Sequence, residues 1–75
     1  MIPYTFRQLQ YFVAIVDHGG LSEAARVLNI SQPALSAALT QLEVLLELRL
    51  LDRQPGRPVR LTRQGHPFLV EARVL

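Results

Sequence analysis

Apolar residues recur along the chain at the three- and four-residue intervals that place side chains on one face of an α-helix. The clearest series is the leucine stripe of the third segment, at Leu35, Leu39, Leu42 and Leu46. The pattern predicts four helices, at residues 6 to about 18, 22–28, 32 to 46 or 47, and after 62. Two segments at 48–53 and 59–62 indicate short strands instead. We therefore expect a mainly α-helical chain with one small hairpin.

The expected helix ends contain residues suited to those positions. Thr5 and Thr62 precede the first and fourth helices, where their hydroxyl oxygens can accept hydrogen bonds from free backbone amides. Ser22 is expected to open the second helix in the same way, and Asn29 to end it in a left-handed conformation. Pro67, at about the fifth position of the fourth helix, is expected to delay or bend that helix.

The second and third helices are separated by Asn29, Ile30 and Ser31 only. Ser31 and Pro33 give the third helix a strong start, because serine caps free amides and proline loses no helical hydrogen bond in the first turn. A helix, a tight turn with an apolar residue in it, and a second capped helix form the helix-turn-helix pattern.

The third helix also has a polar face opposite its leucine stripe. Gln32, Ser36 and Thr40 recur there at four-residue spacing. Short, uncharged polar side chains of this kind can enter a DNA groove and form hydrogen bonds with base edges or phosphate oxygens. Many ordinary helices begin with a similar cap, so this stretch alone leaves both interpretations open.

The expected hairpin contains most of the positive charge. The net charge is only +2, but five of the eight arginines lie between residues 49 and 63, and lysine is absent. The turn Gln54-Pro55-Gly56-Arg57 has the type II signature, and Pro58 restricts its strand to an edge or a strand start. Arg53, Arg57 and Arg60 are expected to project into solvent, where they can lie along a duplex backbone and reach a minor groove. A solvated surface hairpin would have the same sequence features.

The composition argues against several classes of function. Seventy-five residues form one domain near the lower limit of independent stability, and 49% apolar residues suffice for a core. No apolar run approaches the ~18 to 20 residues that cross a bilayer, and no secretory leader is evident, so we expect a soluble, cytoplasmic protein without a membrane partner. Cysteine is absent, and His18 and His66 lie far apart in the sequence, so neither a metal nor a cofactor is expected.

The acidic residues share no motif, and each is interpreted as helix surface: Asp17, Glu23, Glu43, Glu47, Asp52 and Glu71. The chain has no Gly-rich phosphate loop and no Ser/His/Asp arrangement, so an enzyme is not expected. It also lacks the interleaved aromatic residues on which single-stranded nucleic acids stack.

The fourth helix presents a stripe of Phe68, Leu69, Ala72 and Leu75. Because so short a chain offers this stripe little core to bury against, we expect it to mediate self-association or to continue into a missing part of the protein.

Six short motifs occur in order: Phe6-Arg7-Gln8-Leu9-x-Tyr11-Phe12, Leu21-Ser22-x-Ala24-Ala25-x-x-Leu28, Ser31-Gln32-Pro33-Ala34-Leu35-Ser36, Leu42-Glu43, Arg49-Leu50-Leu51-x-Arg53 and Leu61-Thr62-x-x-Gly65. From about Thr5 to Leu75, the chain resembles the N-terminal domain of LysR-type transcriptional regulators. The resemblance implies a winged helix-turn-helix with a three-helix core, a two-stranded wing and a fourth linker helix. It also implies dimerisation through that helix and binding to double-stranded DNA at interrupted palindromic promoter sites. In that family a C-terminal effector domain, absent from these 75 residues, would bind any small-molecule inducer.

Carried over by position, the family's DNA contacts fall on Ser31, Gln32, Pro33, Ser36, Arg53 and Arg57, and the helical spacing adds Thr40. The sequence departs from the family pattern at four positions. Ala37 stands where the family usually has arginine, so one phosphate or base contact is missing. Glu47 replaces a glycine before the first strand, which can change how the third helix ends. Leu51 replaces an aromatic residue and Gly20 a serine or threonine.

We therefore expect residues 1–61 to form a winged helix-turn-helix that binds DNA, and residues 62–75 to begin the linker and dimerisation helix. The expected function is sequence-specific binding and transcription regulation as a dimer, without catalysis. The alternative is a winged-helix protein interaction module whose arginine hairpin does not bind DNA.

Overall fold

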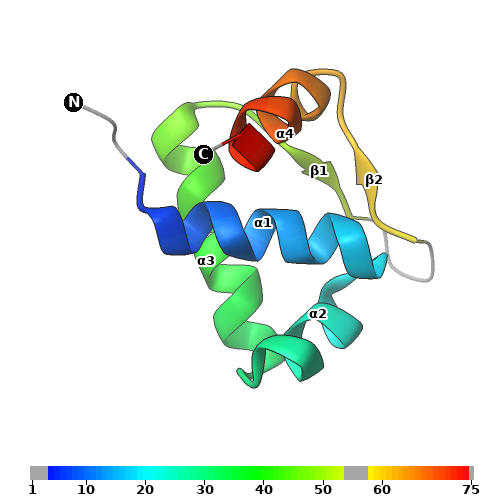
Figure 1. Cartoon of the computed structure of the whole chain (residues 1–75). Coiled ribbons are helices and arrows are strands. Elements are labelled where there is room, and N and C mark those ends of the chain that lie inside the picture. The colour runs from blue at the N-terminus through cyan, green and yellow to red at the C-terminus, as the bar shows by residue number, and fades with distance from the viewer. Residues whose placement is uncertain (1–3, 54–57, 75) are drawn as a thin grey trace.

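The computed structural model describes residues 4–53 and 58–74. Its elements are α1 (Phe6–His18), α2 (Leu21–Leu28), α3 (Gln32–Leu46), β1 (Leu51–Asp52), β2 (Arg60–Leu61) and α4 (Gly65–Val74). The first helix, α1, contacts each of the other three, and Figure 1 shows it crossing α3 with α2 on one side and the hairpin and α4 on the other. This arrangement confirms the expected fold, a three-helix core followed by a two-stranded antiparallel hairpin and a fourth helix.

The caps of α1 and α3 are formed as the sequence predicts. Thr5 accepts a hydrogen bond from the amide of Gln8 at 3.1 Å, and the Gln8 side chain accepts one from the amide of Thr5 at 2.8 Å. Gly19 ends α1 with φ 77°, a left-handed conformation that glycine adopts without steric cost. At the start of α3, the hydroxyl of Ser31 accepts from the amide of Ala34 at 3.2 Å.

The second helix begins one residue earlier than expected. Gly20 occupies the cap position, so Ser22 lies inside the first turn of α2 and does not cap it. Its hydroxyl instead donates to the side-chain oxygen of Gln32 at 2.9 Å, joining α2 to α3. The prediction that Ser22 opens the helix was wrong, because the helix starts at Leu21 with Gly20 at the cap position. Asn29 ends α2 with φ 59°, as expected.

The third helix ends at Leu46, and Glu47 adopts the left-handed conformation with φ 57°. Its amide donates to Val44 O at 3.1 Å, and the amide of Leu48 donates to Glu43 O at 3.2 Å. The usual family glycine at position 47 is thus replaced without loss of this helix end, although a side chain in this conformation is sterically unfavourable.

The two strands are shorter than predicted. Leu51 pairs with Leu61 and Asp52 with Arg60, in antiparallel register. One further bond, from the amide of Thr62 to Leu50 O at 3.0 Å, lies beyond them. The expected type II turn at residues 54–57, which includes Arg57, lies outside the described residues.

The fourth helix begins at Gly65, and Thr62 supports its start. The Thr62 hydroxyl accepts from the amide of Gly65 at 3.0 Å and donates to the carbonyl oxygen of Arg49. Pro67 is therefore the third helical residue and not the fifth, so its missing N–H costs no hydrogen bond inside α4.

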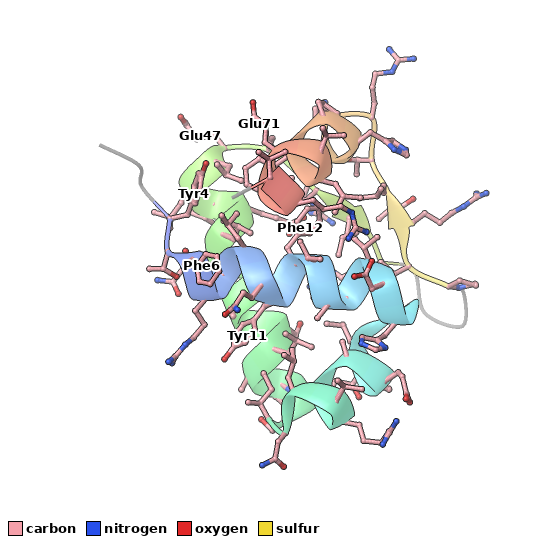
Figure 2. The ribbon with its side chains drawn as sticks, viewed as in Figure 1. Tyr4, Phe6, Tyr11, Phe12, Glu47 and Glu71 are labelled. Atoms are coloured by element: carbon pink, nitrogen blue, oxygen red, sulfur yellow. The ribbon has the colours of Figure 1, made fainter. Side chains whose placement is uncertain are left out.

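The apolar stripe of α4 is not left without a partner. The ring of Phe68 lies 5.5 Å from that of Tyr4 and 5.7 Å from that of Phe12, between centroids, and Ala72 is buried. Figure 2 shows Phe12 on the side of α1 that faces α4. The expectation that this stripe finds little core to bury against was wrong, because α1 packs against it. The exposed apolar residues of α4 are Val70 and Val74, and Leu75 lies outside the described residues.

Candidate nucleic-acid interface

The helix-turn-helix presents the polar face of α3, formed by Gln32, Ser36 and Thr40. Gln32 and Thr40 are exposed, and Ser36 is half-buried. The neighbouring face of α3 is held in the core, because Leu35, Leu39 and Leu42 are almost fully buried. The direction of the polar face is thus determined by the burial of the leucine stripe.

The residues at the start of α3 are also accessible to solvent. Ser31 and Pro33 are exposed, and the half-buried Ile30 in the preceding turn packs against the core. Because the Ser31 hydroxyl accepts from Ala34, this residue can act as a cap and offer its own O–H as a donor. Ser31, Gln32 and Pro33 are therefore exposed at the N-terminal end of α3, and Ser36 and Thr40 lie one and two turns further along the helix.

Arg53 joins this face from the end of the hairpin. One guanidinium nitrogen donates to Ser36 Oγ at 3.3 Å, and another donates to Thr40 Oγ1 at 3.4 Å. The Arg53 side chain is only 21% exposed to solvent. The expectation that Arg53 projects into solvent with the hairpin was wrong, because β1 begins beside α3 and the side chain turns back over the helix. Arg57, the other expected arginine contact, lies outside the described residues.

A buried carboxylate lies beneath this arginine. Glu43 is only 6% exposed, and its Oε2 accepts from the amides of Leu50 at 2.7 Å and Leu51 at 3.2 Å. Its Oε1 accepts from Arg53 at 3.3 Å. The interpretation of Glu43 as helix surface was wrong. Its position four residues after Leu39 was the available signal, since residues at this interval share a helix face.

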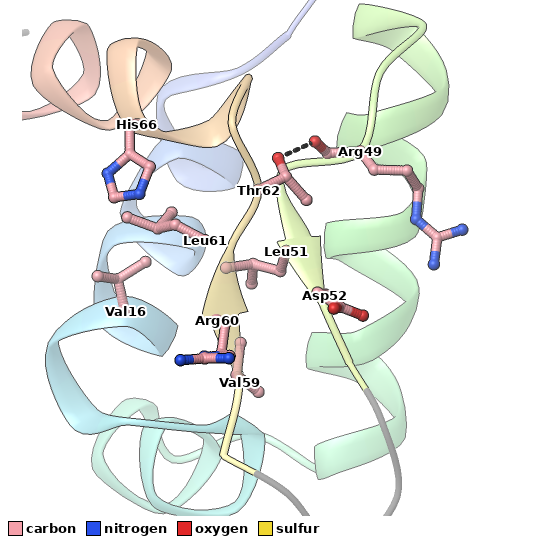
Figure 3. Close-up of a pocket in the computed structure, with 9 residues that line it drawn as sticks. All are labelled: Val16, Arg49, Leu51, Asp52, Val59, Arg60, Leu61, Thr62 and His66. Atoms are coloured by element: carbon pink, nitrogen blue, oxygen red, sulfur yellow. Dashed lines mark hydrogen bonds between the residues drawn. The ribbon is translucent and has the colours of Figure 1, made fainter.

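A second basic region surrounds a hollow of about 800 Å³ between the hairpin, α1 and the start of α4. Arg49, Arg60 and His66 contribute to its lining, and Asp52 is the acidic residue among them. Figure 3 shows the guanidinium groups of Arg49 and Arg60 pointing in different directions. The hydrogen bond from the Thr62 hydroxyl to the Arg49 carbonyl joins the segments just before β1 and just after β2. Arg60, which was expected to lie along a duplex backbone, lines this hollow, whereas Arg53 and the polar residues at the start and on the polar face of α3 do not.

Two exposed ion pairs involve Asp17 and Glu23, two of the other acidic residues of the helices. A hydrogen bond from Arg73 on α4 lowers the pKa of Asp17 on α1, and a hydrogen bond from Arg26 lowers the pKa of Glu23 within α2. Asp17 and Arg73 are 56 residues apart in the sequence, so their contact could not be read from the spacing of helical side chains.

Within residues 4–53 and 58–74, no group of three or more His, Asp or Glu side chains is placed to hold a metal ion. None of the helices in the same part of the chain has the length and apolar character needed to cross a bilayer.

A short turn between α2 and α3, an exposed polar face on the second of these helices, and a following antiparallel hairpin define a winged helix-turn-helix protein. Residues 6–66 match the family of bacterial regulatory helix-turn-helix proteins of the lysR type. The chain therefore belongs to the lysR family, whose members are DNA-binding transcriptional regulators.

Two relatives illustrate the similarity. The chain is 51% identical over 69 residues to the SDS degradation transcriptional activation protein of Pseudomonas sp. (strain ATCC 19151), covering 92% of this chain and 22% of that protein. It is 44% identical over 70 residues to the HTH-type transcriptional regulator ClcR of Pseudomonas putida, covering 93% of this chain and 24% of ClcR. The chain thus spans roughly a quarter or less of the length of these relatives.

Solved structures give the same family. A crystal structure of a BenM DBD/catB site 1 DNA complex has a TM-score of 0.88 and 41% identity, over 93% of this chain and 74% of that one. A CbnR DBD–DNA complex has the same TM-score and identity, over 93% of this chain and 79% of that one.

Proposed function

We propose that this chain binds double-stranded DNA at a preferred sequence and regulates transcription, with the polar face of α3 in the major groove. The observation that carries this proposal is the position of Arg53: its guanidinium lies against Ser36 and Thr40, so one positive charge accompanies the uncharged polar side chains of α3. Base edges in the major groove offer donors and acceptors to such side chains, and the flanking phosphates attract the arginine. The similar BenM and CbnR domains were crystallised with DNA, which supports this use of the fold.

Within the proposed complex the residues have different tasks. Gln32 is exposed at the start of α3 and carries an amide that can pair with a base edge. Ser31, Pro33, Ser36 and Thr40 are proposed to approach the sugar-phosphate backbone or neighbouring bases. Arg53 and Arg57 are proposed to contact phosphates, and Arg57 to reach the minor groove from the hairpin turn.

We further propose that two copies bind an interrupted palindromic promoter site through two α3 helices. Residues 1–61 would contact DNA, and residues 62–75 would begin the helix that joins the copies. Val70 and Val74 are exposed by 64% and 81% and lie one turn apart on α4, which supports this assignment. We also propose a cytoplasmic location, because double-stranded promoter DNA is the proposed partner. The proposed activity includes no catalytic step, and a small-molecule inducer would bind outside these 75 residues.

Equilibrium binding to duplex DNA over a range of salt concentrations tests the proposal. A random-sequence duplex library should yield enriched sequences, and the affinity for an enriched duplex should fall steeply as salt rises, because neutralised phosphates release counterions. A chain that enriches no sequence and shows no salt-dependent affinity for duplex DNA would support the protein interaction module instead.

A further inference from the structure

We infer that Glu43 is a positioning residue for DNA binding: its buried carboxylate holds the guanidinium of Arg53 on the polar face of α3, where Arg53 can meet a phosphate beside the helix. This inference rests on the proposed function and assigns a role to a residue that would not itself touch DNA.

The two carboxylate oxygens of Glu43 have separate partners. Oε2 accepts from the amides of Leu50 and Leu51, at 2.7 and 3.2 Å, and so fixes the chain where it enters β1. Oε1 accepts from Arg53 at 3.3 Å. One side chain on a rigid helix therefore determines both the start of the hairpin and the direction of its arginine.

Arg53 is otherwise held only by neutral hydroxyl groups among the described residues, at 3.3 Å from Ser36 and 3.4 Å from Thr40. Of these three contacts, the ion pair with Glu43 is the one in which Arg53 meets a negative charge. A guanidinium has five N–H donors, and these bonds use three of them, so donors remain for a phosphate oxygen. Holding the side chain in place before binding reduces the conformational entropy that is lost on contact with DNA.

A carboxylate near DNA can also weaken binding, because it repels phosphates and can compete with them for the arginine. Replacing Glu43 by glutamine distinguishes the positioning of Arg53, which favours binding, from the repulsion of phosphates, which weakens it. The amide oxygen can still accept from Leu50 and Leu51, but the amide NH2 then faces the donors of Arg53 and cannot hold it. Glu47→Gln is the matched control, since it also removes one carboxylate from the end of α3 but at an exposed position.

The experiment uses a duplex enriched from a random library by the unmodified chain, together with a scrambled duplex. We expect Glu43→Gln to bind the enriched duplex about five- to tenfold more weakly, with a salt slope shallower by about one unit because one phosphate contact is lost. Glu47→Gln should bind equally well or more tightly. In an Arg53→Ala background, Glu43→Gln should cause no further loss, since the carboxylate acts through that arginine.

Tighter binding by Glu43→Gln, or a further loss in the Arg53→Ala background, would contradict the positioning role of Glu43 and leave the proposed function intact. If the unmodified chain enriches no duplex, the proposed function fails and the inference fails with it. If Glu43→Gln does not fold, NMR of the guanidinium groups in the unmodified chain tests whether Arg53 is held in place. Hindered rotation at Arg53 relative to the exposed Arg60 supports the positioning role, and equally fast rotation contradicts it.

Discussion

Gly65 is a residue at which one added carbon atom would meet the backbone of another element. It is buried at the start of α4, and a β-carbon there would lie 2.3 Å from Leu50 O and 3.2 Å from a methyl carbon of Leu61. Gly65→Ala should therefore push α4 away from the hairpin and destabilise the domain by about 1–3 kcal/mol. For a domain of this size, thermal denaturation should show a melting temperature lower by at least about 4 °C.

The matched control is Gly20→Ser. Gly20 has extended backbone, and a β-carbon there would have no neighbour within 4 Å. Serine would also add an N-cap hydroxyl to α2, so we expect an unchanged or slightly higher melting temperature. Equal destabilisation by both variants would mean that the close approach at Gly65 is not the cause.

Gln32 and Arg57 should differ in what their loss does to DNA binding. Gln32→Ala removes a proposed base contact, so it should cost roughly 1–3 kcal/mol on the preferred duplex and little on a scrambled one. Arg57→Ala should weaken binding to both duplexes alike and reduce the salt slope by about one unit. Fluorescence anisotropy on both duplexes across a salt series measures these effects. Equal losses on both duplexes for Gln32→Ala would remove it from the base-contacting role.

Among the secondary-structure elements, α4 has one face in the core and another in solvent. Val70→Asp and Val74→Asp change the exposed face, so they should reduce self-association in sedimentation experiments without lowering the melting temperature. Leu69→Asp should lower both, because Leu69 is half-buried against the core.

Failure of the valine variants to alter the monomer–dimer equilibrium would contradict the proposed role of α4. The comparison separates loss of an interface from loss of the fold, since the melting temperature reports only on the latter.

For the whole molecule, the Asp17–Arg73 pair ties α4 to α1 in a pH-dependent way. The hydrogen bond from Arg73 holds the pKa of Asp17 below its ordinary value of 3.8 in the folded chain. Because the folded carboxyl has the lower pKa, its stabilisation is complete above the ordinary value and disappears as pH falls through the lowered one. Asp17→Asn should therefore melt slightly below the unmodified chain near neutral pH, and the difference should vanish in strong acid.

Both side chains of this pair are about half-exposed, so added salt should also reduce the difference at neutral pH. Circular dichroism melts from neutral pH down to pH ~2 follow the loss of the ion pair as Asp17 is protonated, while Arg73 keeps its charge. A difference that does not change with pH would show that Asp17 acts through packing and not through its charge.

The sequence by itself determined the helices, their order and the polar face of α3. These features depend on periodicity and on caps within a few residues, such as Thr5 with Gln8 and Ser31 with Ala34. The order of the motifs also identified the family, which the match over residues 6–66 shows. The residues expected to contact DNA remain predictions, and the structure shows only that most of the candidates on α3 are exposed and that Arg53 lies against two of them.

Only the tertiary structure decided where several side chains point. Ser22 bonds to Gln32 and does not cap its helix, Glu43 is buried, and Arg53 lies over α3. The Phe68 stripe is likewise covered by α1. In each case the partner lies ten or more residues away or in a separate element. The local periodicity of the sequence cannot predict such contacts, because they depend on how the helices and the hairpin pack together in three dimensions.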